Sequence, residues 1–144
     1  MFKVLGVGLL ALAIALAIVP KFTDCESQGS VITLRDATGK VTGTTPMKCH
    51  WTGVAEIGVA MPLGMVGIMM VFTRKRETAA YLGITGIALA GVAIALPNLL
   101  IGVCKMPTHI CVTTMKPALT ALGSIAALGS VVGLVWSRRS KTLT

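Results

Sequence analysis

Four long apolar runs constrain this chain more than any other feature of its sequence. They lie at about residues 3–20, 53–72, 78–97 and 117–136. A helix needs about 20 apolar residues to cross the hydrocarbon core of a bilayer, and these runs have that length or nearly so. Charged residues form 12% of the chain, whereas soluble domains carry about 25%. We therefore predict one domain over residues 1–144, an all-α membrane protein with a four-transmembrane-helix bundle.

The first apolar run has two interpretations. Ala-x-Ala triplets at 13–15 and 15–17 are typical of a secretory signal peptide, which would be removed from the mature protein. The triplets lie inside the apolar run, however, instead of following it. We therefore expect a retained helix.

Positive charges gather where the apolar runs end, at Lys3, at residues 74–76 and at residues 138–141. Dense Lys and Arg mark the cytoplasmic side of a membrane protein. This places both termini in the cytoplasm and the loops 21–52 and 98–116 outside the cell (inner or plasma) membrane. The net charge of +8 therefore indicates membrane topology and contact with the lipid bilayer, and we expect no nucleic-acid partner.

The first outer loop carries two β-branched stretches, residues 31–35 and 40–44, on either side of an Asp- and Gly-containing turn. This pattern predicts a small β-hairpin in an extracytoplasmic cap. An isolated hairpin is marginally stable in water. We expect it to lean on the second outer loop or to be pinned by Cys25 and Cys49.

Small residues recur at four-residue spacing in the apolar runs, most clearly at Gly129 and Gly133. Such pairs let membrane helices approach closely. The motif serves either packing within the chain or dimerisation with a second copy, and the spacing favours packing within the chain only slightly.

All the cysteines and both histidines fall in the two outer loops. The four cysteines, Cys25, Cys49, Cys104 and Cys111, allow three pairings. Disulfides are the leading interpretation for an oxidising compartment. We expect the pairs Cys25–Cys49 and Cys104–Cys111, because each then closes its own loop, and we expect no cofactor.

A Cu(I) or other soft-metal site is an alternative, which would make copper the cofactor. Thiolate and thioether ligands favour Cu(I), and three methionines at four-residue spacing form a ladder along one face of the second run. The candidate ligands are Met47, Cys49, His50, Met106, His109 and Cys111, with the ladder Met61, Met65 and Met69.

A membrane thiol–disulfide oxidoreductase is the further alternative, although the chain lacks the C-x-x-C pair that such enzymes usually carry.

Glu56 is the acid that falls within a predicted span. It serves either as a contact for an ion, a partner or a lysine (Lys105 or Lys116), or as an interfacial residue at the helix mouth. We expect Glu56 to lie about one helical turn from the outer interface, within reach of water.

The segment Met47-Lys48-Cys49-His50-Trp51-Thr52, followed by Ala55-Glu56 and by a second loop with Cys104, Cys111 and Met115-Lys116-Pro117, resembles an uncharacterised family of small bacterial four-helix membrane proteins. The resemblance implies an accessory protein associated with export-type ABC transporters. With no catalytic constellation in the sequence, we expect a non-enzymatic accessory or assembly subunit whose partners are other membrane subunits or a second copy of itself.

Overall fold

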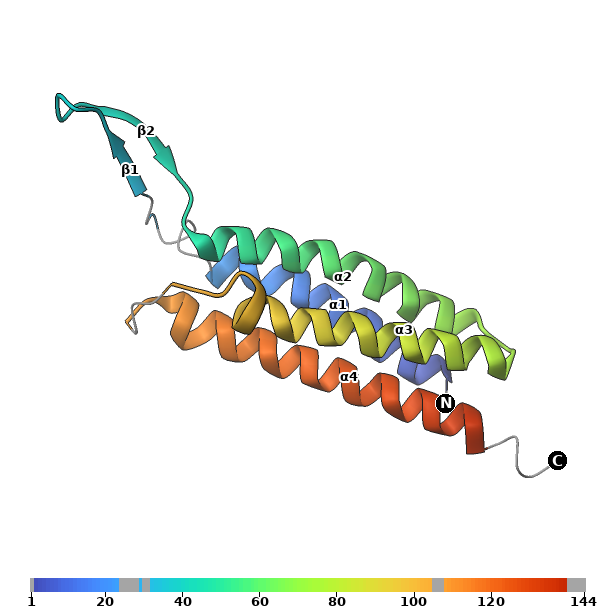
Figure 1. Cartoon of the computed structure of the whole chain (residues 1–144). Helices are drawn as coiled ribbons and strands as arrows, with labels where there is room; N and C mark the ends of the chain where they lie inside the picture. Colours follow the sequence, from blue (N-terminus) through green and yellow to red (C-terminus); the bar gives the residue numbers. More distant parts are fainter. Residues whose placement is uncertain (1, 24–28, 30–31, 105–107, 140–144) are drawn as a thin grey trace.

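Four helices run side by side in the computed structural model, which describes residues 2–23, 29, 32–104 and 108–139 (Figure 1). Within these residues, each of the four is long and apolar enough to cross a membrane. The predicted all-α membrane bundle is thus confirmed. The helices are α1 (Phe2–Thr23), α2 (Lys48–Phe72), α3 (Arg76–Ala95) and α4 (Lys116–Arg139).

Helix α2 begins at Lys48, well before the apolar run that predicted its start near residue 53. The early turns are amphipathic, so hydropathy alone places the boundary too late. Cys49, Thr52 and Glu56 are all buried, and their spacing of three and four residues puts them on one helix face. The end of the segment that was predicted as a loop is therefore the first part of a helix, one face of which is buried in the bundle.

Helix α3 passes directly into a five-residue π-helix, η1 (Leu96–Leu100), which carries the chain beyond Pro97. Proline has no N–H to donate, and a wider turn accommodates it. The N–H groups of Ile101 and Gly102 both donate to the carbonyl of Leu96, at 3.2 and 3.0 Å. Gly102, with φ of 76°, then ends the helix. A second π-helix, η2 (Cys111–Met115), leads directly into α4.

The bundle is made of two helix pairs, with α1 packed mainly on α2 and α3 mainly on α4. The start of α1, the end of α4 and the α2–α3 turn lie at one end, and the hairpin and the described parts of the α3–α4 loop lie at the other (Figure 1). We call these the arginine end and the cysteine end. The interior is filled by fully buried side chains, of which the largest apolar ones are Leu9, Leu16, Leu63, Met70, Met115 and Leu119.

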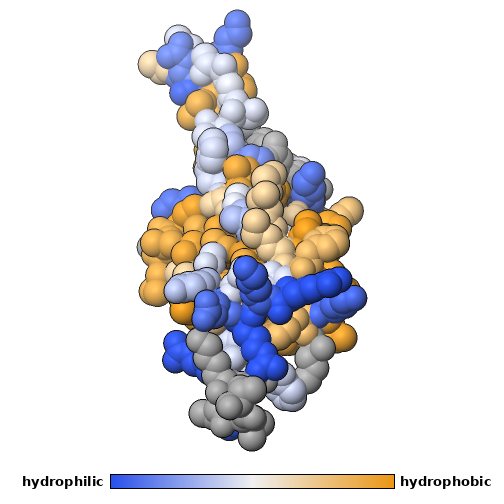
Figure 2. Space-filling view, turned by 90° about the vertical axis from the view of Figure 1, so that its right-hand side faces the viewer, coloured by the Kyte–Doolittle hydropathy of each residue, from blue (hydrophilic) through white to orange (hydrophobic). Residues whose placement is uncertain are grey.

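Hydrophilic side chains gather at the arginine end, surrounded by the apolar surface of the helices (Figure 2). The predicted positive clusters lie at the corresponding helix ends. Arg76 begins α3, and Arg138 and Arg139 form the last turn of α4. One end of the bundle is therefore distinctly more cationic than the apolar middle.

Glycines allow the helix backbones of each pair to touch. A Cβ on Gly67 of α2 would lie 2.9 Å from the carbonyl oxygen of Gly6 in α1, and a Cβ on Gly83 of α3 would lie 3.2 Å from the carbonyl oxygen of Ser130 in α4. Gly133, from the predicted G-x-x-x-G motif, is buried against Met70 and Leu5 of the same chain. Gly133 thus packs helices within the chain, whereas the Gly6–Gly67 contact was not predicted.

We expect Gly67→Val to destabilise the bundle by about 1–3 kcal/mol, because the new side chain forces α1 away from α2. Gly58→Val is the matched control, since Gly58 lies in the same helix with nothing within 4 Å of its missing Cβ. Thermal unfolding of both variants in one detergent measures the difference. Equal stability of the two would contradict the close packing.

The β-hairpin pairs β1 (Ile32–Arg35) with β2 (Val41–Thr45) in antiparallel register. Asp36 closes the turn through its backbone and its carboxylate, which accepts the N–H of Ala37 at 2.7 Å. The hairpin projects away from the bundle (Figure 1), and every residue of β1 is exposed. Most of the hairpin therefore stands clear of the second loop, and Ile32 at its base borders a groove that this loop also lines. Pinning by Cys25 concerns a residue outside the described part.

A candidate sulfur site at the cysteine end

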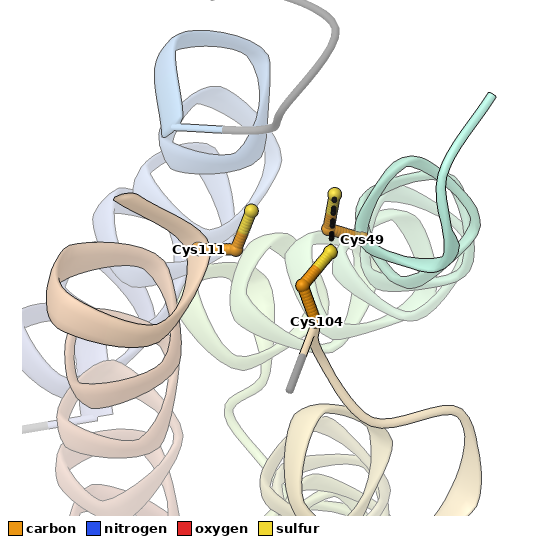
Figure 3. Close-up of side chains that lie close together, drawn as sticks. All are labelled: Cys49, Cys104 and Cys111. Carbon is orange, nitrogen blue, oxygen red and sulfur yellow. Dashed lines mark hydrogen bonds between the residues drawn. The ribbon is translucent and has the colours of Figure 1, made fainter. Parts of the chain in front are cut away.

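Three cysteines from separate segments converge at the cysteine end (Figure 3). The Sγ atoms of Cys49, Cys104 and Cys111 all lie within 4.8 Å of one another. Cys49 comes from the first turn of α2, Cys104 from the loop after η1, and Cys111 from the first residue of η2. Cys49 and Cys111 are fully buried, whereas Cys104 is partly exposed.

The sulfurs are in different bonding states. Cys49 and Cys104 are thiols, and Cys104 donates a hydrogen bond to Cys49 Sγ at 3.6 Å. Cys111 takes part in a disulfide. The expected pairs Cys25–Cys49 and Cys104–Cys111 therefore do not describe this arrangement, and Cys25 itself lies outside the described residues. The expectation paired cysteines within each loop, whereas the bundle brings the start of α2 against the α3–α4 loop.

A threonine hydroxyl fastens that loop to α2. The buried Thr52 Oγ1 donates to the carbonyl oxygen of Gly102 at 2.6 Å, and it also lies 3.3 Å from the carbonyl oxygen of Lys48. Gly102 can turn the chain back toward α2 because its positive φ costs a glycine little. Cys104 follows two residues later, so this hydrogen bond helps to hold its thiol against Cys49.

Replacing Thr52 with Val keeps the side-chain shape but removes the hydroxyl. A buried hydrogen bond contributes about 1 kcal/mol, so we expect Cys104 to react about fivefold faster with a maleimide. Thr113→Val is the control, because the exposed Thr113 hydroxyl bonds to the nearby His109 carbonyl instead of crossing between segments. Unchanged Cys104 reactivity in Thr52→Val would show that the loop is held by other contacts.

A groove with a volume of about 490 Å³ borders Cys104. Lys48 and Met47 lie on its α2 side, and Ile32 at the base of the hairpin closes it from above. The remaining lining comes from Ile101, Gly102 and Val103. The groove thus reaches the sulfur cluster at Cys104.

Of the other predicted metal ligands, Met47 lines the groove beside Cys104, whereas the histidines do not join the sulfurs. His50 packs edge-on against Trp51, with ring centroids 5.7 Å apart, and neither His50 nor His109 belongs to the cluster among the described residues. Met106 lies outside that part of the chain. Met61, Met65 and Met69 are 68%, 63% and 56% exposed on the outer surface of α2. The methionine ladder of the copper alternative therefore does share one helix face, as its four-residue spacing predicts, and that face points outward instead of toward the bundle interior.

Glu56 lies two helical turns beyond Cys49 on the same face of α2, about 10 Å further along the helix axis. It is fully buried, and neither carboxyl oxygen has a hydrogen-bond partner among the described residues. The expectation of a hydrated interfacial residue is therefore wrong, because α2 starts earlier and carries Glu56 deeper. No hydrogen bond joins it to Lys116, and Lys105 lies outside the described residues.

An unsatisfied buried polar group costs about 1–3 kcal/mol in mutational data. We therefore expect Glu56→Leu to raise the free energy of unfolding by about that amount. Glu77→Leu, at an exposed position in the first turn of α3, removes the same charge without relieving burial and should bring no such gain. Thermal unfolding of both variants tests this, and a destabilised Glu56→Leu would indicate that the carboxyl group has a stabilising partner.

Residues 4–136 of the chain match a family described as a domain of unknown function, DUF4418. No curated protein is significantly similar to the chain. No solved structure is significantly similar either.

Proposed function

The chain belongs to the DUF4418 family of unknown function, and we propose that it is a non-enzymatic accessory or assembly subunit of a larger membrane complex. The proposal is carried by one observation, the projecting hairpin. A two-stranded hairpin is marginally stable by itself in water, and both of its strands are edges that can pair with another chain. A hairpin held away from its own bundle is suited to binding a partner.

One face of the hairpin is apolar. Ile32 and Leu34 alternate with Thr33 and so point to the same side of β1; they are 49% and 51% exposed. Their cross-strand neighbours on that side are Thr45 and Gly43, which leave the apolar side chains uncovered. Such a face gains stability when a protein surface covers it.

The apolar face of the hairpin extends as far as the cysteine end of the bundle. Ile32 belongs both to this face and to the groove beside Cys104. A partner that covers Leu34 and Ile32 would therefore also reach the lip of the groove. The contact would combine the hairpin with the rigid end of α2, which offers more area than either element alone.

The membrane arrangement supports the location of this contact. The hydrophilic residues that gather at the arginine end (Figure 2) include Arg76, Arg138 and Arg139, and from the positive-inside rule we propose that this end and both termini face the cytoplasm. The hairpin then lies on the outer side of the cell membrane. The partner we propose is another membrane subunit with an outer domain, for which an ABC-type transporter is the candidate from the family resemblance.

A photo-cross-linking amino acid at position 34, in native membranes, tests the proposal. We expect one discrete cross-linked protein from position 34 and little from position 33 on the opposite face. In native gels after mild solubilisation, Leu34→Asp should shift the chain from a larger complex to its own mass. Thr33→Asp should leave the complex intact, because the same charge then points away from the apolar face.

Two outcomes would contradict this role. Recovery of the wild-type chain as a monomer, without a discrete cross-link at position 34, would remove the partner. Cross-links only between copies of this chain would instead identify the hairpin as a self-association surface.

A further inference from the structure

The sulfur site supports a reaction that the hairpin contact does not require. We propose that Cys49 and Cys104 form a dithiol–disulfide couple that exchanges electrons with an external disulfide, and that Cys104 is the first sulfur to react. The inference does not depend on the partner protein proposed above. It rests on the separation of the two sulfurs, their unequal exposure and the groove beside Cys104.

The two thiols are positioned to form a bond. Their Sγ atoms lie 3.6 Å apart, whereas a disulfide requires about 2.05 Å. The cysteine side chains approach from two segments that face each other, α2 and the loop after η1 (Figure 3). Closing the gap therefore requires only a local change, a rotation of the cysteine side chains or a small shift of the loop relative to the helix end.

Unequal exposure sets the order of the steps. Cys49 is fully buried, whereas Cys104 is partly exposed and borders the groove. Thiol–disulfide exchange depends on access to the attacking sulfur. An external disulfide in the groove meets Cys104 first and forms a mixed disulfide with it. The buried Cys49 is then the resolving thiol, which reacts with this mixed disulfide.

The exchange balances without a further oxidant. The Cys104 thiolate attacks one sulfur of the external disulfide, forms a mixed disulfide and releases the other sulfur as a thiolate, which takes up a proton. The Cys49 thiolate then attacks Cys104 Sγ, which forms the Cys49–Cys104 bond and releases the second external sulfur as a thiol. Two electrons have passed from the protein dithiol to the external disulfide, and an excess of external thiol reverses both steps.

The state of Cys111 favours this chemistry over a structural zinc site. Because Cys111 takes part in a disulfide, the cluster offers a metal ion two thiolates, fewer than the four protein ligands of structural zinc. Neither histidine completes the set among the described residues.

The test uses the purified full chain in lipid nanodiscs, equilibrated with buffers of glutathione and glutathione disulfide. Acid quenching, alkylation and peptide mass mapping then report each cysteine. We expect the wild-type chain to interconvert between the dithiol and the Cys49–Cys104 disulfide in one two-electron step. In the reduced wild-type chain, Cys104 should be alkylated before Cys49.

Two serine variants separate the roles of the sulfurs. Cys49→Ser should accumulate a stable mixed disulfide with glutathione at Cys104, because the resolving thiol is gone. Cys104→Ser, the matched control, should leave Cys49 at least about tenfold slower to modify, because reactivity follows exposure. Repeating the assay with a disulfide-bonded peptide distinguishes a protein disulfide from a small-molecule disulfide, because the better reaction partner oxidises the dithiol faster.

Three results would overturn the inference. The first is a chain whose Cys49 and Cys104 never join across the whole redox range. The second is Cys49 alkylation that precedes Cys104 alkylation in the wild-type chain, a comparison that needs no variant to fold. The third is stoichiometric binding of Cu(I) or Zn²⁺ that protects both sulfurs from glutathione disulfide, which would identify a metal site instead.

Discussion

The close approach of helix backbones at glycines is the contact on which the bundle depends. Lipid is as apolar as the side chains it surrounds, so burial of Leu or Ile gives membrane helices little reason to associate. Dispersion contacts between closely packed backbones supply that reason, and Gly67 against Gly6 provides one such contact. With the helix pairs fixed in this way, the loops at the cysteine end meet in one arrangement, and sulfurs from distant parts of the sequence come together.

Much of the fold follows from the sequence, because hydropathy and charge report directly on the membrane. The apolar runs predicted all four helices, and the Asp- and Gly-containing turn predicted the hairpin. The small-residue pattern also indicated Gly133 as a packing residue. It did not reveal Gly6 with Gly67, because these two glycines belong to different helices and neither forms a conspicuous pair within its own helix.

The site was harder to predict, because its residues are brought together by tertiary structure. Hydropathy placed the start of α2 after Thr52, so the helical spacing of Cys49, Thr52 and Glu56 was not recognised, and Glu56 was expected near water. The same three residues, read with a period of 3.6, would have indicated a polar stripe facing the interior. The approach of Cys104 to Cys49 has no comparable signal, since pairing cysteines by loop cannot anticipate which loops the helix packing brings into contact.

The two π-helical turns have a consequence for how this chain tolerates changes in length. They flank the loop that carries Cys104, with η1 before it and η2 starting at Cys111, so the cysteine end is joined to α3 and α4 through widened turns. Each residue of an α-helix advances the chain by about 100° around the axis. Loss of a single residue from either turn would leave the apolar spans long enough to cross the bilayer, yet it would rotate the adjoining segment and its cysteine out of alignment. The register of this short loop, as much as its composition, thus determines whether the sulfurs meet.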